Sequence, residues 1–428
     1  TGASNTAVGH ASLASNTTGT QNVSVGYEAF KNGTTGSYCT AIGVSALQAV
    51  VTGNNNTAIG RKAMYDNTSG ADNTAVGNAA LGNNTTGTLN TATGSQSLED
   101  NTTGHSNTAS GHQALNANTT ADNNTAMGMM AMQTNTTGAN NVAVGYTSLR
   151  VSTTASNNVA IGYEAGRSIT TSAGNVYIGK GAGRSTTTSY GSNVAIGQGA
   201  FYTNTTGYSQ TAVGAGALFS NTSGIEGTAL GYEALYSNTT AHYNTAVGHY
   251  ALRANTTGTQ NAAVGKSTLA ANTTGTYNTA IGFKPLLSNT TGTHNSAVGR
   301  TALQNNTTGS YNTGVGMDAG YTTTTGNYNV SIGFNSKATS ATASGQFTLG
   351  DSNISNLRCN DQSFSSLSDS RDKTDVIDSP YGLDFINTVR PVQFLWDTRD
   401  GNAKDGTTRI GFLAQELLAA TNGNNAVL

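Results

Sequence analysis

Short apolar groups recur at a fixed interval through most of the chain, separated by stretches rich in asparagine and threonine. In "NTAVGHYALRANTTGTQNAAVGKSTLAANTTGTYNTAIG", residues 244–282, each glycine that follows an apolar group lies 17 residues from the next. The series runs from Gly9 to Gly350 in 21 units, with one 18-residue step between Gly179 and Gly197. A fixed short period indicates a stacked repeat architecture.

Each unit contains a strand pattern and a turn pattern. "NTAVG" alternates polar and apolar residues, as a short strand does, and we expect its β-branched residue to point inward. "NTTG" predicts a turn, because asparagine can hydrogen-bond its own backbone and glycine accepts positive φ. Seventeen residues suit one coil of two short strands and two turns, whereas helical repeats need about 33 residues or more. We therefore predict an all-β fold, a parallel β-solenoid or β-roll of about 21 coils, roughly 100 Å long at a spacing of about 4.8 Å.

The composition fits such a stack. Charged residues are 9% of the chain, against about 25% in typical globular proteins. One asparagine stands four residues before most of the repeated glycines, as at Asn73 and Asn90, and a second opens each turn, as at Asn84 and Asn101. Stacked coils would place identical amides above one another, and amide ladders satisfy polar groups without charge.

A single coil offers only a thin core, which favours association. We expect each coil to bury one Val or Ile, one Leu and some Ala, and units this small need neighbours to bury enough apolar area. Alanine and glycine at fixed positions also allow close approach of backbones. We therefore predict a homotrimer. The pattern "NTAVGYEAL" resembles the head repeat of trimeric autotransporter adhesins, a parallel β-roll trimer whose unit is shorter than this one.

Several other features of residues 1–350 invite functional hypotheses that the repeat itself explains better. Asn-x-Thr/Ser sequons fall at the turn position, so a structural interpretation outweighs glycosylation. Adjacent threonines would face opposite sides of a strand, which disfavours a flat ice-binding array. "GKGAG" at 179–183 is a variant of the repeat and not a phosphate loop. Equivalent histidines, at which a trimer could gather three copies as metal ligands, lack supporting carboxylates; they are His105, His112, His242 and His249.

The residue after each repeated glycine varies freely and is often aromatic. Such positions on a rigid rod suit contact with a surface or glycan, although exposed filler is an equally good interpretation. They include Tyr27, Arg61, His112, Tyr163, Lys180, Tyr232, His249, Phe283 and Arg300. Residues 1–350 contain no catalytic constellation, and we expect no cofactor.

Charge and cysteine content narrow the partners. The net charge of −2 provides no electrostatic basis for binding nucleic acid or an anionic membrane. No stretch of about 20 apolar residues predicts a membrane span. Cys39 and Cys359 lie far apart without a pairing pattern, which disfavours a disulfide framework. The first residues are neither a signal peptide nor an initiating methionine, so we expect the chain to be a piece of a longer protein.

The repeat ends at Gly350 and the character of the chain then changes. Residues 361–428 contain 16 Asp, Glu, Lys or Arg, against 24 in the preceding 360 residues. We predict a neck at 351–367 and a small α+β domain at 368–428. Its expected elements are a helix over 379–390, a strand over 391–397, and a segment over 409–420 that begins extended and becomes helical.

Several motifs in this segment occur in an order that carries a resemblance. "LSDSRDKTD", "GLDFINTVRPVQFLWDTRDG" and "IGFLAQEL" together resemble the intramolecular chaperone domain, peptidase S74, of phage tail fibres and tailspikes. The resemblance implies that the domain trimerises the upstream β-structure and then cuts itself off before the serine of a Ser-Asp-x-x-x-Lys motif. The family domain usually continues well past "AQEL", so we expect the chaperone to be incomplete at Leu428.

Transferred to this chain, the motif assigns a cleavage site and its residues. The bond cut would be Leu367–Ser368, with Ser368 as the catalytic serine and Lys373 as its base. A lysine whose pKa burial lowers can activate a serine hydroxyl. Asp369 and Arg371 would orient the turn or pair across chains. The spacing of Ser368 and Lys373 alone would favour a solvated polar loop. The family motifs that follow in order favour the cleavage site instead.

The combined hypothesis is a phage tail fibre in the virion. It comprises a trimeric shaft that reaches toward a host receptor or glycan, associates with other tail proteins and ends in a self-cleaving chaperone. A bacterial trimeric surface adhesin is the first alternative, which the repeat supports and the terminal segment does not. The second is the shaft of a tailspike depolymerase, although the chain contains no glycosidase carboxylate pair.

Overall fold

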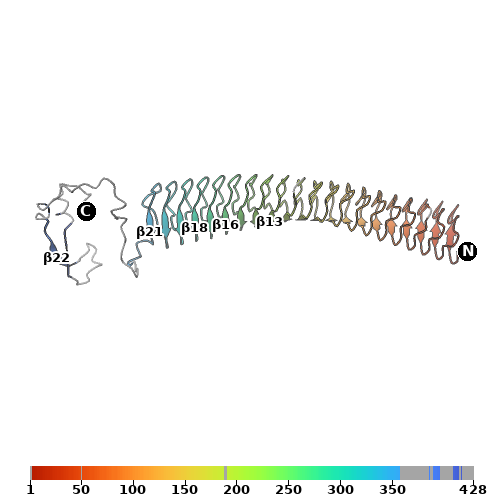
Figure 1. Ribbon diagram of the computed structural model, residues 1–428, viewed down its shortest axis with the longest axis horizontal. Coiled ribbons are helices and arrows are strands. Elements are labelled where there is room, and N and C mark those ends of the chain that lie inside the picture. Colours follow the sequence, from red (N-terminus) through yellow and green to blue (C-terminus); the bar gives the residue numbers. More distant parts are fainter. Residues whose placement is uncertain are drawn as a thin grey trace, which may run out of the picture. The chain divides into compact units, whose positions relative to one another are not determined.

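The computed structural model describes residues 2–49, 51–187, 190–356, 385, 389–395, 408–413 and 416. The chain divides into two compact units, Thr1–Ser355 and Asn356–Leu428. The first unit is a parallel β-solenoid in which each coil contributes one three-residue strand to a single 21-stranded sheet (Figure 1). The prediction of an all-β solenoid with 17-residue coils is therefore confirmed.

Neighbouring strands pair in exact sequence register. Thr245 faces Ala262 across one coil boundary, 17 residues on, and Val176 faces Val194 across the single 18-residue step. The strands are Thr6–Val8 (β1), Val23–Val25 (β2), Thr40–Ile42 (β3), Thr57–Ile59 (β4), Thr74–Val76 (β5), Thr91–Thr93 (β6), Thr108–Ser110 (β7), Thr125–Met127 (β8), Val142–Val144 (β9), Val159–Ile161 (β10), Val176–Ile178 (β11), Val194–Ile196 (β12), Thr211–Val213 (β13), Thr228–Leu230 (β14), Thr245–Val247 (β15), Ala262–Val264 (β16), Thr279–Ile281 (β17), Ser296–Val298 (β18), Thr313–Val315 (β19), Val330–Ile332 (β20) and Phe347–Leu349 (β21).

The expected second strand of each coil is absent from the described coils. In its place the chain after each repeated glycine forms turns with alternating positive φ. After Gly231, for example, φ is 50° at Glu233 and 52° at Leu235, which is left-handed rather than extended backbone. The turn is still bonded to the next coil, since the Leu235 amide donates to the Ala251 carbonyl at 3.0 Å. Coil-to-coil hydrogen bonds therefore continue where strand geometry does not.

The interior of the coils is filled by alanine and leucine. The middle residue of a strand points inward, as at Ala58 and Ala229, and the Ala–Leu pair after the glycine, as at Ala234–Leu235, is equally buried. The prediction that the β-branched residue points inward is wrong: Ile59 is 37% exposed. Because a three-residue strand directs only its middle side chain to the interior, the residue before the glycine must face outward.

Both predicted amide ladders are present and confirmed. At the turn position, the Asn84 side chain donates to Asn67 Oδ1 at 2.8 Å, and Asn101 donates to Asn84 Oδ1 at 2.9 Å. In the second ladder, Asn90 Oδ1 accepts the backbone amide of Asn107 at 3.0 Å. These asparagines are fully buried. Their burial explains the recurring sequons as a structural device and leaves no room for a glycan on them.

Glycine recurs at two positions of the repeat, for a different physical reason at each. At the strand end the repeated glycines from Gly9 to Gly316 have φ between 124° and 143°, and a Cβ on Gly111 would lie 2.6 Å from the Gly128 carbonyl oxygen. The glycine of "NTTG" was expected to use positive φ, and Gly87 does not. A Cβ there would instead collide with the Asn84 side chain and the carbonyl of the next coil.

The second unit is described in part. Strands β22 (Val392–Leu395) and β23 (Thr408–Gly411) form an antiparallel pair, which confirms extended structure within the predicted 391–397 strand and at the start of 409–420. The Val389 amide donates to the Phe385 carbonyl at 3.2 Å, the spacing of a helical hydrogen bond, inside the predicted helix. Among the described residues, no helix has the length and hydrophobicity to cross a membrane.

Candidate functional site

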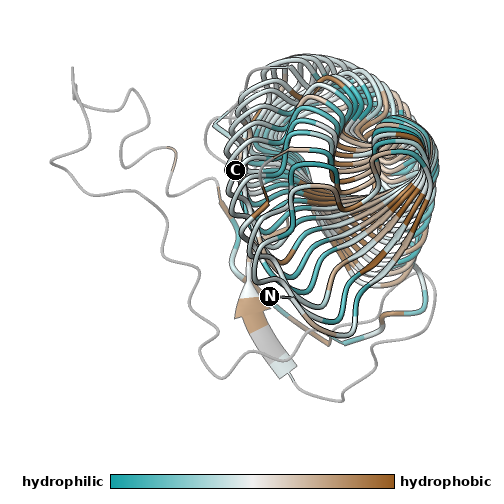
Figure 2. Ribbon diagram, turned by 90° about the vertical axis from the view of Figure 1, so that its right-hand side faces the viewer, coloured by the Kyte–Doolittle hydropathy of each residue, from teal (hydrophilic) through white to brown (hydrophobic). Residues whose placement is uncertain are grey.

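The outward-facing residues before the repeated glycines form an apolar stripe along the sheet, interrupted only at the neighbouring strands β6 and β7. The residue is Val, Ile, Leu or Met in 19 of the 21 strands, with Thr93 and Ser110 as the exceptions. Exposure is 38% at Ile42, 44% at Ile281 and 40% at Val315. We call these 21 positions the outer stripe. Viewed along the stack, hydrophobic segments of successive coils line up in bands (Figure 2).

The surroundings of the outer stripe make it suitable for contact with another protein surface. None of the 21 strands contains a charged residue, and the first residue of most strands is a partly exposed threonine or valine, such as Thr57 or Val159. A monomeric protein rarely exposes a contiguous apolar patch of more than a few hundred Å². At about 4.8 Å per strand, 21 strands make a stripe roughly 100 Å long.

Copies of the same chain are geometrically suited to cover this stripe. A neutral apolar row meets no like-charge repulsion when it is brought against itself, unlike a charged row. Parallel copies in register would bring side chains of the same kind together at every coil, as in other symmetric interfaces. Sequence analysis missed this surface because it assigned the same residues to the interior. A three-residue strand flanked by glycine is the signal that could have identified it.

The predicted cleavage residues lie outside the described residues. They are Leu367, Ser368, Asp369, Arg371 and Lys373. The described part of the same unit contains β22, β23 and an ion pair, in which Arg390 donates to Glu416 Oε1 at 2.6 Å. That pair joins "NTVRPV" to "AQEL", two of the motifs that carried the resemblance.

Three of the four histidines considered as metal ligands, His105, His242 and His249, have other partners. His105 Nδ1 accepts the Thr88 backbone amide at 3.0 Å, and His242 Nδ1 accepts that of Ile225 at 3.1 Å, so both link one coil to the next. His249 stacks on Tyr232, with ring centroids 5.3 Å apart. Among the residues that the structure describes, no group of three His, Cys, Asp or Glu side chains could hold a metal ion.

Cys39 is a core residue of its coil. It occupies the ladder position four before Gly43, and its backbone amide donates to Asn22 Oδ1 at 2.8 Å. Burial raises the pKa of its thiol, which keeps the thiol protonated and unreactive. Cys359 lies outside the described residues.

Comparison with known proteins gives one family match. Residues 368–428 match the Peptidase_S74 model, described as "Chaperone of endosialidase". A search of curated protein sequences finds no match. A Peptidase_S74 segment is typical of phage tail fibres and endosialidase-like proteins, and it implies trimeric assembly. The chain thus joins a β-solenoid of 17-residue coils to a C-terminal segment that matches the Peptidase_S74 chaperone model.

Proposed function

We propose that this chain is a phage tail-fibre protein, whose solenoid is a trimeric shaft for host attachment and whose C-terminal segment is a self-cleaving folding chaperone. The carrying observation is the combination of a long repetitive shaft, whose repeat ends at Gly350, with a Peptidase_S74 match that begins at residue 368. The proposal comprises assembly through the outer stripe, alignment by the chaperone, and cleavage at Leu367–Ser368.

The outer stripe supports the assembly step. Three parallel copies around a common axis would cover side chains such as Ile281 and Val298, which are 44% and 39% exposed in the single chain. At about 25 cal/mol per Å² of apolar surface removed from water, a stripe of this length supplies a large association energy. No charged strand residue has to be desolvated, so that energy is not offset by the cost of burying charge.

The regularity of the shaft creates a register problem that a chaperone would solve. A slip of one coil between copies places Val264 where Ile281 was, with almost no local change in packing. Weakly specified register leads to misassembly during folding. A domain that joins three C-terminal ends before the shaft forms sets the register once. Removing that domain afterwards makes unfolding effectively irreversible, which is kinetic stability.

The cleavage step rests on the family match and on the local sequence. The match begins at residue 368, and Ser368 is followed by Asp369 and by Lys373. In the proposed chemistry the Ser368 hydroxyl is the nucleophile and the Lys373 amine accepts its proton, as in other Ser–Lys systems. Asp369 and Arg371 are supporting residues.

The test uses the complete gene. We expect the wild-type protein to lose its C-terminal fragment on a denaturing gel, and Ser368→Ala and Lys373→Ala to remain full length. Ser366→Ala, two residues upstream, is the matched control and should cleave normally. Cleavage in either Ser368→Ala or Lys373→Ala, or a wild-type chain that stays intact, would contradict the assignment.

A further inference from the structure

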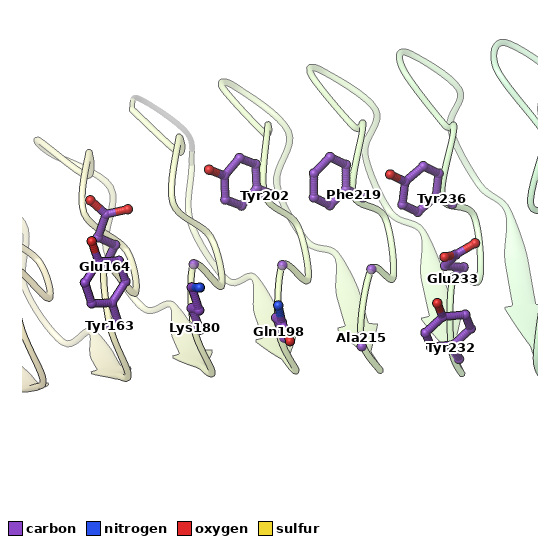
Figure 3. Close-up of a pocket in the computed structure, with 13 residues that line it drawn as sticks. Tyr163, Glu164, Lys180, Gln198, Tyr202, Ala215, Phe219, Tyr232, Glu233 and Tyr236 are labelled. Atoms are coloured by element: carbon purple, nitrogen blue, oxygen red, sulfur yellow. The ribbon is translucent and has the colours of Figure 1, made fainter.

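A hollow of 330 Å³ interrupts the surface of the coils that contain β10 to β14. Figure 3 shows its residues in two rows, one beside the strands and one further along the coils. Lys180, Gln198 and Ala215 stand in the row beside the strands, and aromatic rings form the other row. We call this feature the shaft groove.

Three glycines open the shaft groove. Gly181, Gly199 and Gly216 each stand two residues after a repeated glycine, with φ of 66°, 63° and 68°. The same position holds Glu164 and Glu233 in the flanking coils, at φ of 56° and 50°, so the backbone here accepts ordinary residues. The glycines are therefore not needed for backbone conformation. Their effect is to leave out three consecutive side chains.

Three aromatic rings form one wall of the groove. Ring centroids of Tyr202 and Phe219 are 5.0 Å apart with an interplanar angle of 2°, and those of Phe219 and Tyr236 are 5.1 Å apart at 10°. This spacing is that of offset rather than eclipsed rings, and Figure 3 shows the three rings side by side as open hexagons. The result is a strip of parallel rings that advances one ring per coil along the groove.

Each end of the strip has an arginine held by a glutamate. Arg184 lies 5.3 Å from the Tyr202 ring and donates to Glu164 at 2.7 Å. At the other end Arg253 lies 5.7 Å from the Tyr236 ring and is paired with Glu233 at 2.5 Å. Cation–π contact and ion pairing together fix these side chains. The other oxygen of Glu164 lies 3.6 Å from Arg167 Nη1, and Glu233 also accepts a hydrogen bond from Tyr232, so both carboxylates are held in place at the ends of the groove.

Lys180 adds a cation to the wall beside the strands. No described residue forms an ion pair with it, and its Nζ lies 5.8 Å from the Tyr163 ring centroid. Gln198 in the next coil supplies an amide with both donors and an acceptor. The groove therefore combines a wall of parallel aromatic rings with carboxylate, amide and ammonium groups placed around it.

We propose that the shaft groove binds an oligosaccharide, with a sugar acid as the favoured component. The apolar face of a pyranose ring stacks on an aromatic ring, while its hydroxyls both donate and accept hydrogen bonds. One ring per coil is a spacing comparable to the length of one sugar unit in an extended chain. A lysine without an ion-pair partner favours a carboxylate-bearing sugar. The inference rests on the proposed role in host attachment, to which it adds a place and a ligand class.

Trimeric assembly would multiply the effect of a weak site. Three parallel chains carry three shaft grooves at the same height, so a surface coated with one glycan can engage all of them. Linked sites raise the overall avidity well above the affinity of one site. A shallow groove is then sufficient for attachment.

The test measures binding of the full chain to immobilised trisaccharides of neutral hexoses, N-acetylhexosamines and hexuronic acids. We expect saturable binding, strongest for the uronic acids. Phe219→Ala should weaken it about tenfold or more, since one stacked ring is lost. Gly199→Glu should abolish it by filling the groove with the residue found at this position in the flanking coils. Lys180→Met should remove the preference for uronic acids and leave neutral sugars bound.

The matched control is a second aromatic row that lies outside the shaft groove. Tyr311 stacks between His294 and Tyr328, with centroid distances of 4.8 and 4.9 Å, so Tyr311→Ala removes a comparable ring elsewhere on the shaft. It should leave binding unchanged. Absence of saturable binding to every trisaccharide, or equal losses in Tyr311→Ala and Phe219→Ala, would overturn the proposal. Self-cleavage at Ser368 is measured separately, so the two proposals can fail independently.

Discussion

The coils near residues 244–323 and those near residues 162–236 are built on the same backbone but are filled differently. In the first region the turn ladder runs without a break up to Asn306, as from Asn255 through Asn272 to Asn289, before Thr323 takes the turn position. In the second region Ile169 and Thr186 replace the turn asparagine and are buried. We call the coils of the first region regular and those of the second region irregular. The irregular coils lack some of the side-chain hydrogen bonds between coils, and they contain the shaft groove.

The interior of the irregular coils shows how such changes are accommodated. Tyr177 occupies a position that holds alanine in most coils and is fully buried. Two glycines, Gly166 and Gly183, replace the leucine of the Ala–Leu pair, and a Cβ on Gly183 would lie 2.5 Å from the Tyr177 ring. A large residue at one position is thus balanced by missing side chains at two others. Close packing requires this compensation.

The two regions share the outer stripe, so charges placed in it should have the same effect in both. Ile281→Asp with Val298→Asp in the regular coils, or Ile196→Asp with Val213→Asp in the irregular coils, would bury unpaired carboxylates between copies. Each such charge costs about 3–5 kcal/mol. We expect both pairs to dissociate the trimer in sedimentation velocity. Thr274→Asp, at an exposed turn, should not, and a trimer that tolerates either pair would place the interface elsewhere.

The compensation around Tyr177 can be tested directly. Tyr177→Ala should lower the local opening free energy by about 3–5 kcal/mol, since it leaves a cavity. Gly183→Leu alone should also destabilise, because the new side chain meets the ring. Combined, the two changes recreate the arrangement of a regular coil and should recover much of the loss. Hydrogen exchange at the amides of β11 reports each value; additive losses would show that the positions are not coupled.

A buried asparagine of the continuous ladder should contribute more to local stability than an exposed asparagine. Asn272→Ala removes the donor to Asn255 Oδ1 and to the Gly275 carbonyl, which are 2.8 and 3.0 Å away. Leaving buried acceptors unpaired costs about 1–3 kcal/mol, again measurable by hydrogen exchange. The exposed Asn78→Ala is the control, with an expected change within about 0.5 kcal/mol. An equal change in opening free energy for both variants would show that the ladder does not stabilise the coils.

The smallest expected effect is a pH dependence at the end of the shaft groove. Burial opposes ionisation of Glu233, but hydrogen bonds from Arg253 and Tyr232 outweigh it and lower the pKa. Because the pKa of Glu233 is lowered in the folded state, the Glu233–Arg253 pair contributes its full stabilisation above the ordinary glutamate pKa of about 4.3. The contribution is lost as pH falls through the lowered value. Melting curves from pH 7 to 3 should show a slightly smaller acid-induced loss in Glu233→Gln than in wild type, and identical curves would count against the pairing.

Sequence alone determined the architecture of the shaft. The 17-residue period indicates that one coil stacks on the next, so the number of coils, the "NTTG" turn and the amide ladders follow from it, whereas the turns after each repeated glycine do not. The family motifs after residue 367 were equally readable, because "GLDFIN" and "AQEL" are distinctive even in one chain. The repeated asparagines also explained the low charge of the shaft, because amide ladders satisfy polar groups without charge.

Tertiary structure decided which way the side chains point. The sequence pattern is the same whether Val76 or Ala75 faces inward, and only the three-residue length of the strand places the alanine inside and the valine outside. The shaft groove was also invisible in sequence, since its parts, such as Gly199 and Phe219, lie 20 residues apart and meet only through stacking. The 17-residue period determines which residues stack on one another along the axis. The backbone φ angles within one coil determine which of those residues lie in the core, at the interface or in the groove.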